Sequence, residues 1–171
     1  VAVQGRARKD AGVEGMVLEA CAGLEEVECA AEAVKKNSEL RFFASMTFSK
    51  TPDGHKTMMG VGVKDFVDAM QQAGALLVGS NCGNGILKMV ELAEEFRSVS
   101  RTANLLFKAN AGEPHLQDGH LCYSETPEIF TASLAGLLAF SPSAVGGCCG
   151  TTPAHLQMIK RTIGDYSPDK Q

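Results

Sequence analysis

The sequence has no tryptophan, only two tyrosines and no long apolar run, and these absences exclude several classes of protein. Glycine or a charged residue interrupts every apolar run well before the roughly 18 residues that suggest a membrane-spanning helix. The N-terminal segment lacks the apolar core of a signal peptide. Basic residues form no patch with interleaved aromatics, and the formal net charge of −4 offers no face for nucleic acid. We therefore expect a cytoplasmic protein that acts on a small molecule, with neither nucleic acid nor a membrane as a partner.

The six cysteines include no Cys-x-x-Cys pair, so the commonest redox motif and the zinc-ribbon pattern are both absent. Adjacent cysteines pair poorly with each other, and a reducing compartment favours metal-binding or catalytic thiols over disulfides. The remaining composition, with 44% hydrophobic and 21% charged residues, is typical of a soluble α/β protein. A chain of 171 residues suits one domain but is short for a complete β/α barrel of about 250 residues.

Apolar runs and amphipathic stretches alternate along the chain. The apolar runs predict strands at residues 16–19, 40–48, 75–80, 105–108 and 144–146. The helical patterns cover residues 24–36, 65–73, 85–97, 127–139 and 153–164. Five strand-then-helix units in a row favour a parallel sheet with helices outside it.

Two segments are predicted as long loops because they are rich in turn residues. They are residues 49–63 and 109–125, and each follows a predicted strand, where binding residues often lie. The first dozen residues resemble the tail of a helix whose own strand is absent. We therefore expect the chain to be the C-terminal part of a larger fold.

Three of the cysteines follow predicted strands and are surrounded by glycine. Cys82 lies in Ser-Asn-Cys-Gly-Asn-Gly, and Cys148 and Cys149 lie in Gly-Gly-Cys-Cys-Gly-Thr-Thr-Pro. Catalytic zinc is held by three protein ligands and keeps a fourth position open. Neighbouring strand residues point to opposite sides, so the adjacent pair shares one ion only where the backbone bends, which glycine permits. The alternative is a buried Cys82 and a chance pair, but the glycine context favours a zinc site.

Three thiolates around a divalent cation leave one net negative charge, which makes the ion a weak Lewis acid toward water. A substrate thiol that enters as the fourth ligand loses its proton. The bound thiolate still attacks carbon, so alkylation of sulfur is more natural at such a site than hydrolysis. The residues alone therefore indicate transfer of an alkyl group to a thiol.

Both cysteine segments carry a family resemblance. Gly-Ser-Asn-Cys at residues 79–82 and Gly-Gly-Cys-Cys-Gly-Thr-Thr-Pro at residues 146–153 resemble the two zinc motifs of the homocysteine S-methyltransferase family. Residues 18–26, 45–48 and 108–114 are similar to its intermediate segments. The resemblance implies an α/β fold, a parallel β/α barrel of TIM type, with only the C-terminal five or so units in a single partial domain at residues 1–171. It also implies Zn²⁺ on Cys82, Cys148 and Cys149, and methylation of homocysteine to methionine.

The resemblance also implies a role for Glu19, which matches the family carboxylate that holds the substrate ammonium. Other residues are candidates by their position in the chain. Asn110 sits where it orients the site or occupies the open zinc position, although an ordinary turn asparagine is a competing interpretation. Ser45 and Asn81 are further candidates for polar substrate contacts. Two family positions differ here: Ala20 stands where the family has threonine, and Ala109 stands where it has proline. The family's acidic Asp-Gly motif has no counterpart in this sequence.

Several alternatives stay open at this point. The methyl donor is a methylcorrinoid, with a corrinoid-carrying partner domain, or methyltetrahydrofolate, a betaine or a sulfonium, all of which the family uses. A second function is a non-catalytic zinc-binding fragment or subunit that needs an N-terminal half-barrel chain or self-association to complete the barrel. A nucleophilic pair of Cys149 and His155 is a minor alternative, because no orienting partner is evident.

Overall fold

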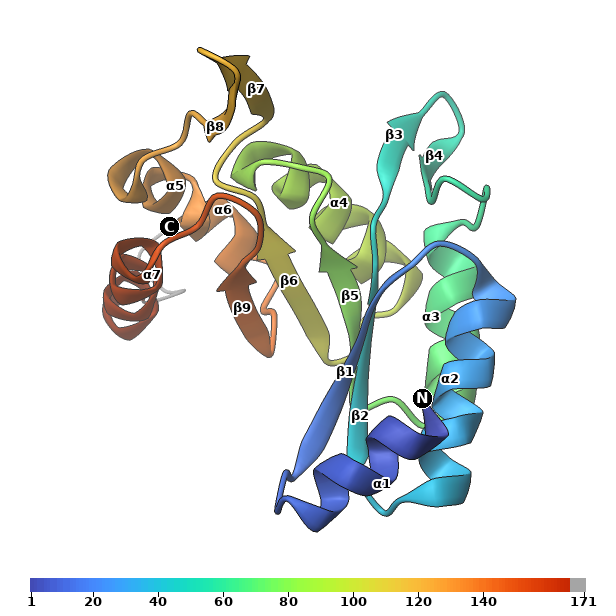
Figure 1. Ribbon diagram of the computed structural model, residues 1–171. Coiled ribbons are helices and arrows are strands. Elements are labelled where there is room, and N and C mark those ends of the chain that lie inside the picture. Colours follow the sequence, from blue (N-terminus) through green and yellow to red (C-terminus); the bar gives the residue numbers. More distant parts are fainter. Residues whose placement is uncertain (167–171) are drawn as a thin grey trace.

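The computed structural model describes residues 1–166, and its centre is a sheet of five parallel strands (Figure 1). The strands are β1 (Gly15–Cys21), β2 (Arg41–Met46), β5 (Leu77–Asn81), β6 (Leu105–Ala109) and β9 (Ala144–Gly147). Their order in the sheet is their order along the chain, so every connection passes to the adjacent strand. All five predicted strands are confirmed within a few residues of their predicted ends, and so is the parallel sheet; the barrel of TIM type stays a prediction.

Helices α2 to α4, α6 and α7 connect or follow these strands, and they cover one face of the sheet. The helices are α1 (Ala2–Asp10), α2 (Leu24–Asn37), α3 (Val63–Ala73), α4 (Ile86–Val99), α5 (Pro127–Ala132), α6 (Leu134–Leu138) and α7 (Pro153–Asp165). Helix α3 ends at Gly74, whose φ of 85° allows a left-handed cap. The prediction of one helix over residues 127–139 was wrong, because Ser133, at φ −97° and ψ −4°, ends α5 and begins α6. No helix within residues 1–166 is long and apolar enough to cross a membrane.

The hydrophobic core fills the space between the sheet and the helices. Its centre is a cluster of four buried phenylalanines from β6, α3, α4 and the segment after β2, with ring centroids 5.5–6.4 Å apart in edge-to-face contacts. They are Phe48, Phe66, Phe96 and Phe107. This cluster fixes the chain where β2 ends and the first hairpin begins.

The opposite face of the sheet is only partly covered by the described residues. Val17 is 46% exposed, whereas its neighbours Met16 and Leu18 are buried under the helices. From this open face Glu19 on β1 forms an ion pair with Lys108 on β6, across the two intervening strands. In a flat sheet these backbones would be about 14 Å apart, close to the full reach of the two side chains, so a curled sheet favours the contact. Within residues 1–166 the edge strands β1 and β9 each have a single neighbour, so the sheet is open.

Two β-hairpins replace the long loops that the sequence predicted. They are β3 (Ser49–Thr51) with β4 (Gly54–Lys56), and β7 (Pro114–Gln117) with β8 (His120–Tyr123). Both stand beyond the carboxyl ends of the central strands (Figure 1). The second turns through Asp118 and Gly119, whose φ values of 50° and 78° match a two-residue turn of type I′. The plain-loop prediction was therefore wrong, although the Asp-Gly pairs that signal a hairpin were present in the sequence.

Candidate metal centre

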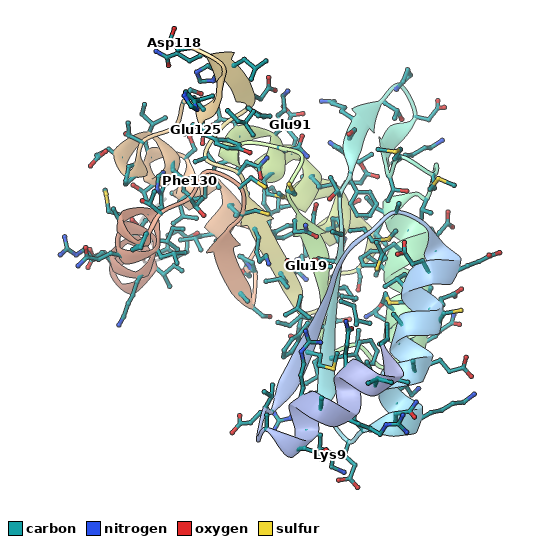
Figure 2. The ribbon with its side chains drawn as sticks, in the orientation of Figure 1. Lys9, Glu19, Glu91, Asp118, Glu125 and Phe130 are labelled. Atoms are coloured by element: carbon teal, nitrogen blue, oxygen red, sulfur yellow. The ribbon has the colours of Figure 1, made fainter. Side chains whose placement is uncertain are left out.

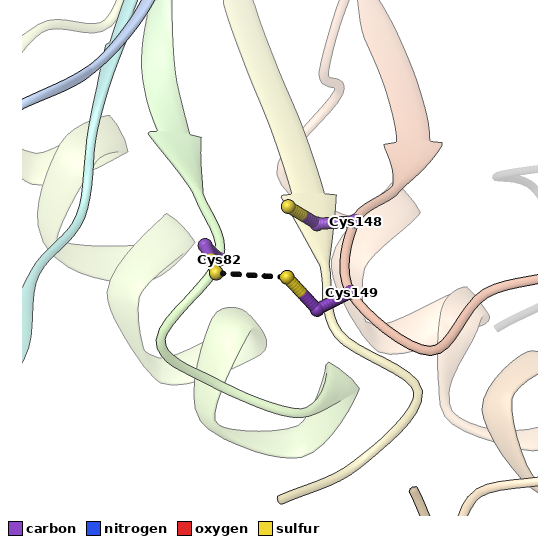
Figure 3. A group of neighbouring side chains, drawn as sticks. All are labelled: Cys82, Cys148 and Cys149. Atoms are coloured by element: carbon purple, nitrogen blue, oxygen red, sulfur yellow. Dashed lines mark hydrogen bonds between the residues drawn. The ribbon is translucent and has the colours of Figure 1, made fainter. Parts of the chain in front are cut away.

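Three cysteines converge at the carboxyl end of the sheet (Figure 3). Cys82 follows β5, and Cys148 and Cys149 follow β9; the two strands flank β6 on either side. The three sulfur atoms lie within 4.8 Å of one another, and those of Cys82 and Cys149 are 3.5 Å apart. Sulfur ligands on a tetrahedral zinc ion are roughly 3.8 Å apart, so this donor set fits the ion that the sequence predicts.

The backbone around Cys82 is bent into an uncommon conformation. Cys82 has a φ of 60°, which is rare outside glycine, and Gly83 follows with a φ of 72°. The Cys82 amide donates to the Lys108 carbonyl at 3.0 Å, and the Asn84 amide donates back to the Cys82 carbonyl at 2.8 Å. Residues in such conformations gather at functional sites, where the surrounding structure holds them in place.

The bend that the sequence required after β9 is present. The Cys148 amide donates to the Ala109 carbonyl at 2.8 Å, which continues the pairing of β9 with β6 as far as the cysteines. The chain then turns at Gly150, with a φ of 79°, and the Thr151 hydroxyl donates to the Cys148 carbonyl at 2.7 Å. This turn lets both adjacent cysteines face Cys82.

Asn110 ties the two cysteine segments together. Its side chain is buried, and its Oδ1 accepts a hydrogen bond from the Cys149 amide at 3.2 Å. Its own amide donates to the carbonyl of Asn84, two residues after Cys82, at 2.9 Å. Asn110 therefore links the two cysteine segments, and its predicted role of orienting the site stays a prediction.

The three thiols do not ionise alike in the absence of a cation. Burial and the neighbouring Cys82 raise the pKa of Cys148 to about 11. Burial also acts to raise the pKa of Cys82, but hydrogen bonds from Cys149 and from the Gly83 backbone outweigh it and leave this pKa below its ordinary value. A bound cation removes the repulsion that opposes a second and a third thiolate. The three sulfur atoms are thus close enough together to hold one metal ion.

Glu19 lies on the open face of the sheet, beside a β-bulge (Figure 2). The pairing of β1 with β2 shifts between Leu18 and Cys21, and Ala20 has a φ of 63°. Bulges of this kind redirect side chains next to active sites. The Glu19 carboxylate contacts the Lys108 ammonium, and the Lys108 stem passes over Gly146 of β9.

Comparison with known proteins agrees with this geometry. Residues 2–163 match the sequence profile of the family described as Homocysteine S-methyltransferase. The chain belongs to this family. It is 29% identical over 171 residues to a methionine synthase of Mycobacterium tuberculosis, covering 95% of the chain and 14% of that protein. It is 27% identical over 162 residues to a methionine synthase of Mycobacterium leprae, covering 90% of the chain and 13% of that protein.

Solved structures share the fold. The apo form of the homocysteine methyltransferase MmuM from Escherichia coli matches with a TM-score of 0.71 at 18% identity, covering 94% of this chain and 57% of that one. The carboxyl transferase domain of Rhizobium etli pyruvate carboxylase matches with a TM-score of 0.62 at 12% identity, covering 99% of this chain and 28% of that one. The chain therefore spans only part of the proteins that it resembles.

Two residues that were predicted as polar contacts for the substrate form a hydrogen bond with each other. Ser45 is fully buried, and its hydroxyl donates to Oδ1 of the buried Asn81 at 2.8 Å. They lie on β2 and β5, the strands that the Glu19–Lys108 pair spans. The structure thus places them below the ion pair, and a direct substrate contact stays a prediction.

His155 is not part of a nucleophilic pair with Cys149. It is buried, and its Nδ1 accepts a hydrogen bond from the Thr152 amide at 3.1 Å in the capping box of α7. Its Nε2 donates to the Glu125 carbonyl at 3.0 Å. Both ring nitrogens are therefore used structurally, which removes the minor alternative.

Sequence reasoning missed two residues near the metal centre. Tyr123, at the end of β8, packs its ring against Gly150, and partial burial and the nearby Cys149 raise its pKa. Lys108 belongs to a segment that resembles the family, but its pairing with Glu19 was not predicted. Neither contact has a sequence signal. Tyr123 reaches Gly150 because the β7–β8 hairpin places it there, and Lys108 reaches Glu19 because the folded sheet brings β6 and β1 within reach of each other.

Proposed function

We propose that this chain carries out zinc-dependent methyl transfer to the thiol of homocysteine, giving methionine. The observation that carries the proposal is the convergence of the sulfur atoms of Cys82, Cys148 and Cys149 within 4.8 Å at the carboxyl end of the sheet. Membership in the homocysteine S-methyltransferase family supports the same reaction. Active sites of β/α barrels lie at this end of the strands.

The three cysteines are the proposed ligands, and a zinc ion held by them supplies an electron-rich environment that keeps a substrate thiol deprotonated. The substrate sulfur attacks the methyl carbon in line with the bond to the donor. The new sulfur–carbon bond forms as the donor–carbon bond breaks, and that bond's electron pair stays with the donor. The thiol proton is released when the substrate binds.

The chain's own residues position the substrate in this proposal. Glu19 holds the ammonium group, because its carboxylate lies on the open face near the cysteines and is 39% exposed. Asn110 fixes the two cysteine segments, because its Oδ1 accepts a hydrogen bond from the Cys149 amide and its own amide donates to the Asn84 carbonyl. Ser45 and Asn81 form the polar floor beneath the substrate.

Other domains or chains complete the enzyme in this proposal. The chain covers 13–14% of the methionine synthases that it matches, so residues 1–171 form one partial domain of the larger architecture. The methyl donor is carried by a corrinoid-bearing partner domain or is methyltetrahydrofolate itself. A cytoplasmic location is part of the proposal, because a reducing compartment keeps three thiols available to a metal.

A second candidate is a zinc-binding subunit that is inactive alone. The two open edges of the sheet, at β1 and β9, favour it, since unpaired edges and a partly exposed inner face invite pairing with other strands. Its partner is an N-terminal half-barrel or a second copy of the chain.

Methionine formation separates the two candidates. The zinc-loaded chain is incubated with homocysteine and with methylcobalamin, methyltetrahydrofolate or a methyl sulfonium in turn, and methionine is quantified. Methionine from the wild-type chain and from Cys29→Ser, but not from Cys82→Ser, supports the enzyme, because Cys29 is exposed on α2 outside the site. A zinc-loaded chain that binds no thiol contradicts the enzyme proposal.

A further inference from the structure

The open face of the sheet carries a lysine whose role the proposed reaction does not explain. Lys108 lies on β6, and its side chain is 23% exposed. It is next to the candidate metal centre, because its carbonyl accepts a hydrogen bond from the Cys82 amide at 3.0 Å. Its stem lies over Gly146, where an added Cβ would come within 3.4 Å of it. Its ammonium contacts the Glu19 carboxylate.

A structural role alone explains this placement poorly. A partly exposed lysine–carboxylate pair contributes little to stability, typically about 0–1 kcal/mol. Lys108 and Glu19 lie on strands separated by two others, and both side chains extend over the same open face rather than into the core. The pair therefore presents a positive and a negative group side by side, beside the cysteines.

This arrangement is complementary to an amino acid. The α-carbon of a zwitterion carries an ammonium and a carboxylate, and the Glu19–Lys108 pair offers the opposite charge to each. A lysine ammonium has three donors, so it binds an incoming carboxylate while it keeps its contact with Glu19. Glu19 accepts hydrogen bonds from the substrate ammonium in the same way.

We propose that Lys108 binds the α-carboxylate of the amino-acid thiol and, with Glu19, makes the site selective for zwitterionic thiols. This inference rests on the proposed function, since it concerns the substrate of the same site. It assigns to Lys108 a specificity role that is separate from metal binding and from the methyl transfer.

Thiol binding to the cobalt(II)-loaded chain tests the inference without turnover. Three thiols are titrated and followed by the sulfur-to-cobalt charge-transfer absorption: homocysteine, the aminopropanethiol that lacks its carboxylate, and the mercaptobutanoate that lacks its amino group. For Lys108→Met we expect the dissociation constants of homocysteine and mercaptobutanoate to rise about ten- to a hundredfold, and that of aminopropanethiol to stay within about twofold.

Two further variants complete the design. Glu19→Gln should weaken the binding of homocysteine and aminopropanethiol but leave the binding of mercaptobutanoate unchanged. For the two truncated thiols this is the reverse of the pattern expected for Lys108→Met. Lys108→Arg keeps the charge and should restore homocysteine binding to within about tenfold of the wild type. Unchanged aminopropanethiol binding by Lys108→Met also shows that this variant is folded and metal-loaded.

The outcomes separate this inference from the proposed function. If Lys108→Met weakens the binding of all three thiols equally, or of none, the proposed role of Lys108 is overturned. Thiol binding by the wild-type chain, and with it the proposed function, is not affected by that result. Failure of the wild-type chain to bind any of the three thiols overturns both the proposed function and this inference.

Discussion

The cysteines differ in how the chain holds each of them. Cys82 sits in a left-handed backbone conformation and receives hydrogen bonds that lower its pKa, whereas Cys148 is more buried and its pKa is raised to about 11. Cys149 is exposed, and its amide is fixed by Asn110. Cys82 is thus prepared to ionise before Cys148.

A pH dependence of the metal-free chain follows from Cys148. A pKa raised in the folded state stabilises the fold below the ordinary value of 9.0, and this contribution is lost as the pH rises toward about 11. We expect the free energy of unfolding to fall over this window, and to fall less steeply in Cys148→Ala. Denaturant titrations at several pH values measure the free energy of unfolding of the wild type and of the variant. Cys122 is half-buried and outside the candidate site, so Cys122→Ala is the control and should show the same fall with pH as the wild type. A Cys148→Ala slope equal to that of the wild type would contradict this account.

Gly150 is a second residue with a measurable role. An added Cβ there would lie 2.2 Å from Cγ of Tyr123, and its φ of 79° disfavours any side chain. We expect Gly150→Ala to lower the free energy of unfolding by at least about 2 kcal/mol and to weaken metal binding. Gly164→Ala is the control, because no atom lies within 4 Å of its Cβ position in α7 and alanine favours a helix by up to about 1 kcal/mol. Equal stabilities of the two variants would show that the Tyr123 contact does not constrain the turn.

At this scale the sequence revealed the three cysteines of the candidate metal centre but not their surroundings. Cys82, Cys148 and Cys149 were identifiable because glycine surrounds each segment and the motif is specific. Tyr123 and Lys108 were not, because their neighbours come from other elements. Ser45 and Asn81 were recognised as polar positions, but their mutual hydrogen bond depends on strand register, which the sequence does not state.

At the scale of elements, the strands were predictable and the hairpins were not. Each central strand is a short apolar run between turn residues, which is the sequence pattern typical of a buried strand. The hairpins are four residues or fewer per strand and mostly exposed, so they carry no apolar alternation. Their only signals were the Asp-Gly turns at residues 53–54 and 118–119.

The β3–β4 hairpin is anchored to α4 by hydrogen bonds between a buried histidine and a partly buried carboxylate. His55 is buried, its Nδ1 lies 2.6 Å from Oε2 of Glu95, and its amide donates to the same carboxylate. We expect Glu95→Gln to lower the free energy of unfolding by about 1–3 kcal/mol, since a charge-assisted contact to a buried group is lost. Hydrogen exchange should show faster exchange of the hairpin amides.

Glu94→Gln is the matched control for this prediction. Glu94 is an exposed neighbour on the same helix, so its substitution should change stability by less than about 0.5 kcal/mol. Unchanged hairpin exchange in Glu95→Gln would mean that packing, and not this pair, holds β3 and β4 in place.

At the scale of the whole molecule, the proposed metal site joins separate parts of the fold. The proposed ligands come from β5 and β9, which are not neighbours, so a bound ion links elements that the sheet joins only through β6. Zinc at a hundred times its dissociation constant should stabilise the fold by about 2.7 kcal/mol. Thermal unfolding with zinc and with a chelator measures this difference, which we expect in the wild type and Cys29→Ser and not in Cys82→Ser. A zinc effect of the same size in Cys82→Ser would place the ion elsewhere.

The coordination of bound zinc tests the central claim most directly. X-ray absorption on the zinc-loaded chain counts the sulfur ligands before and after homocysteine is added. We expect the three sulfurs of Cys82, Cys148 and Cys149 at about 2.3 Å, and a fourth at the same distance once homocysteine binds. Fewer than three sulfurs in the free chain, or a count that homocysteine leaves unchanged, would contradict the account.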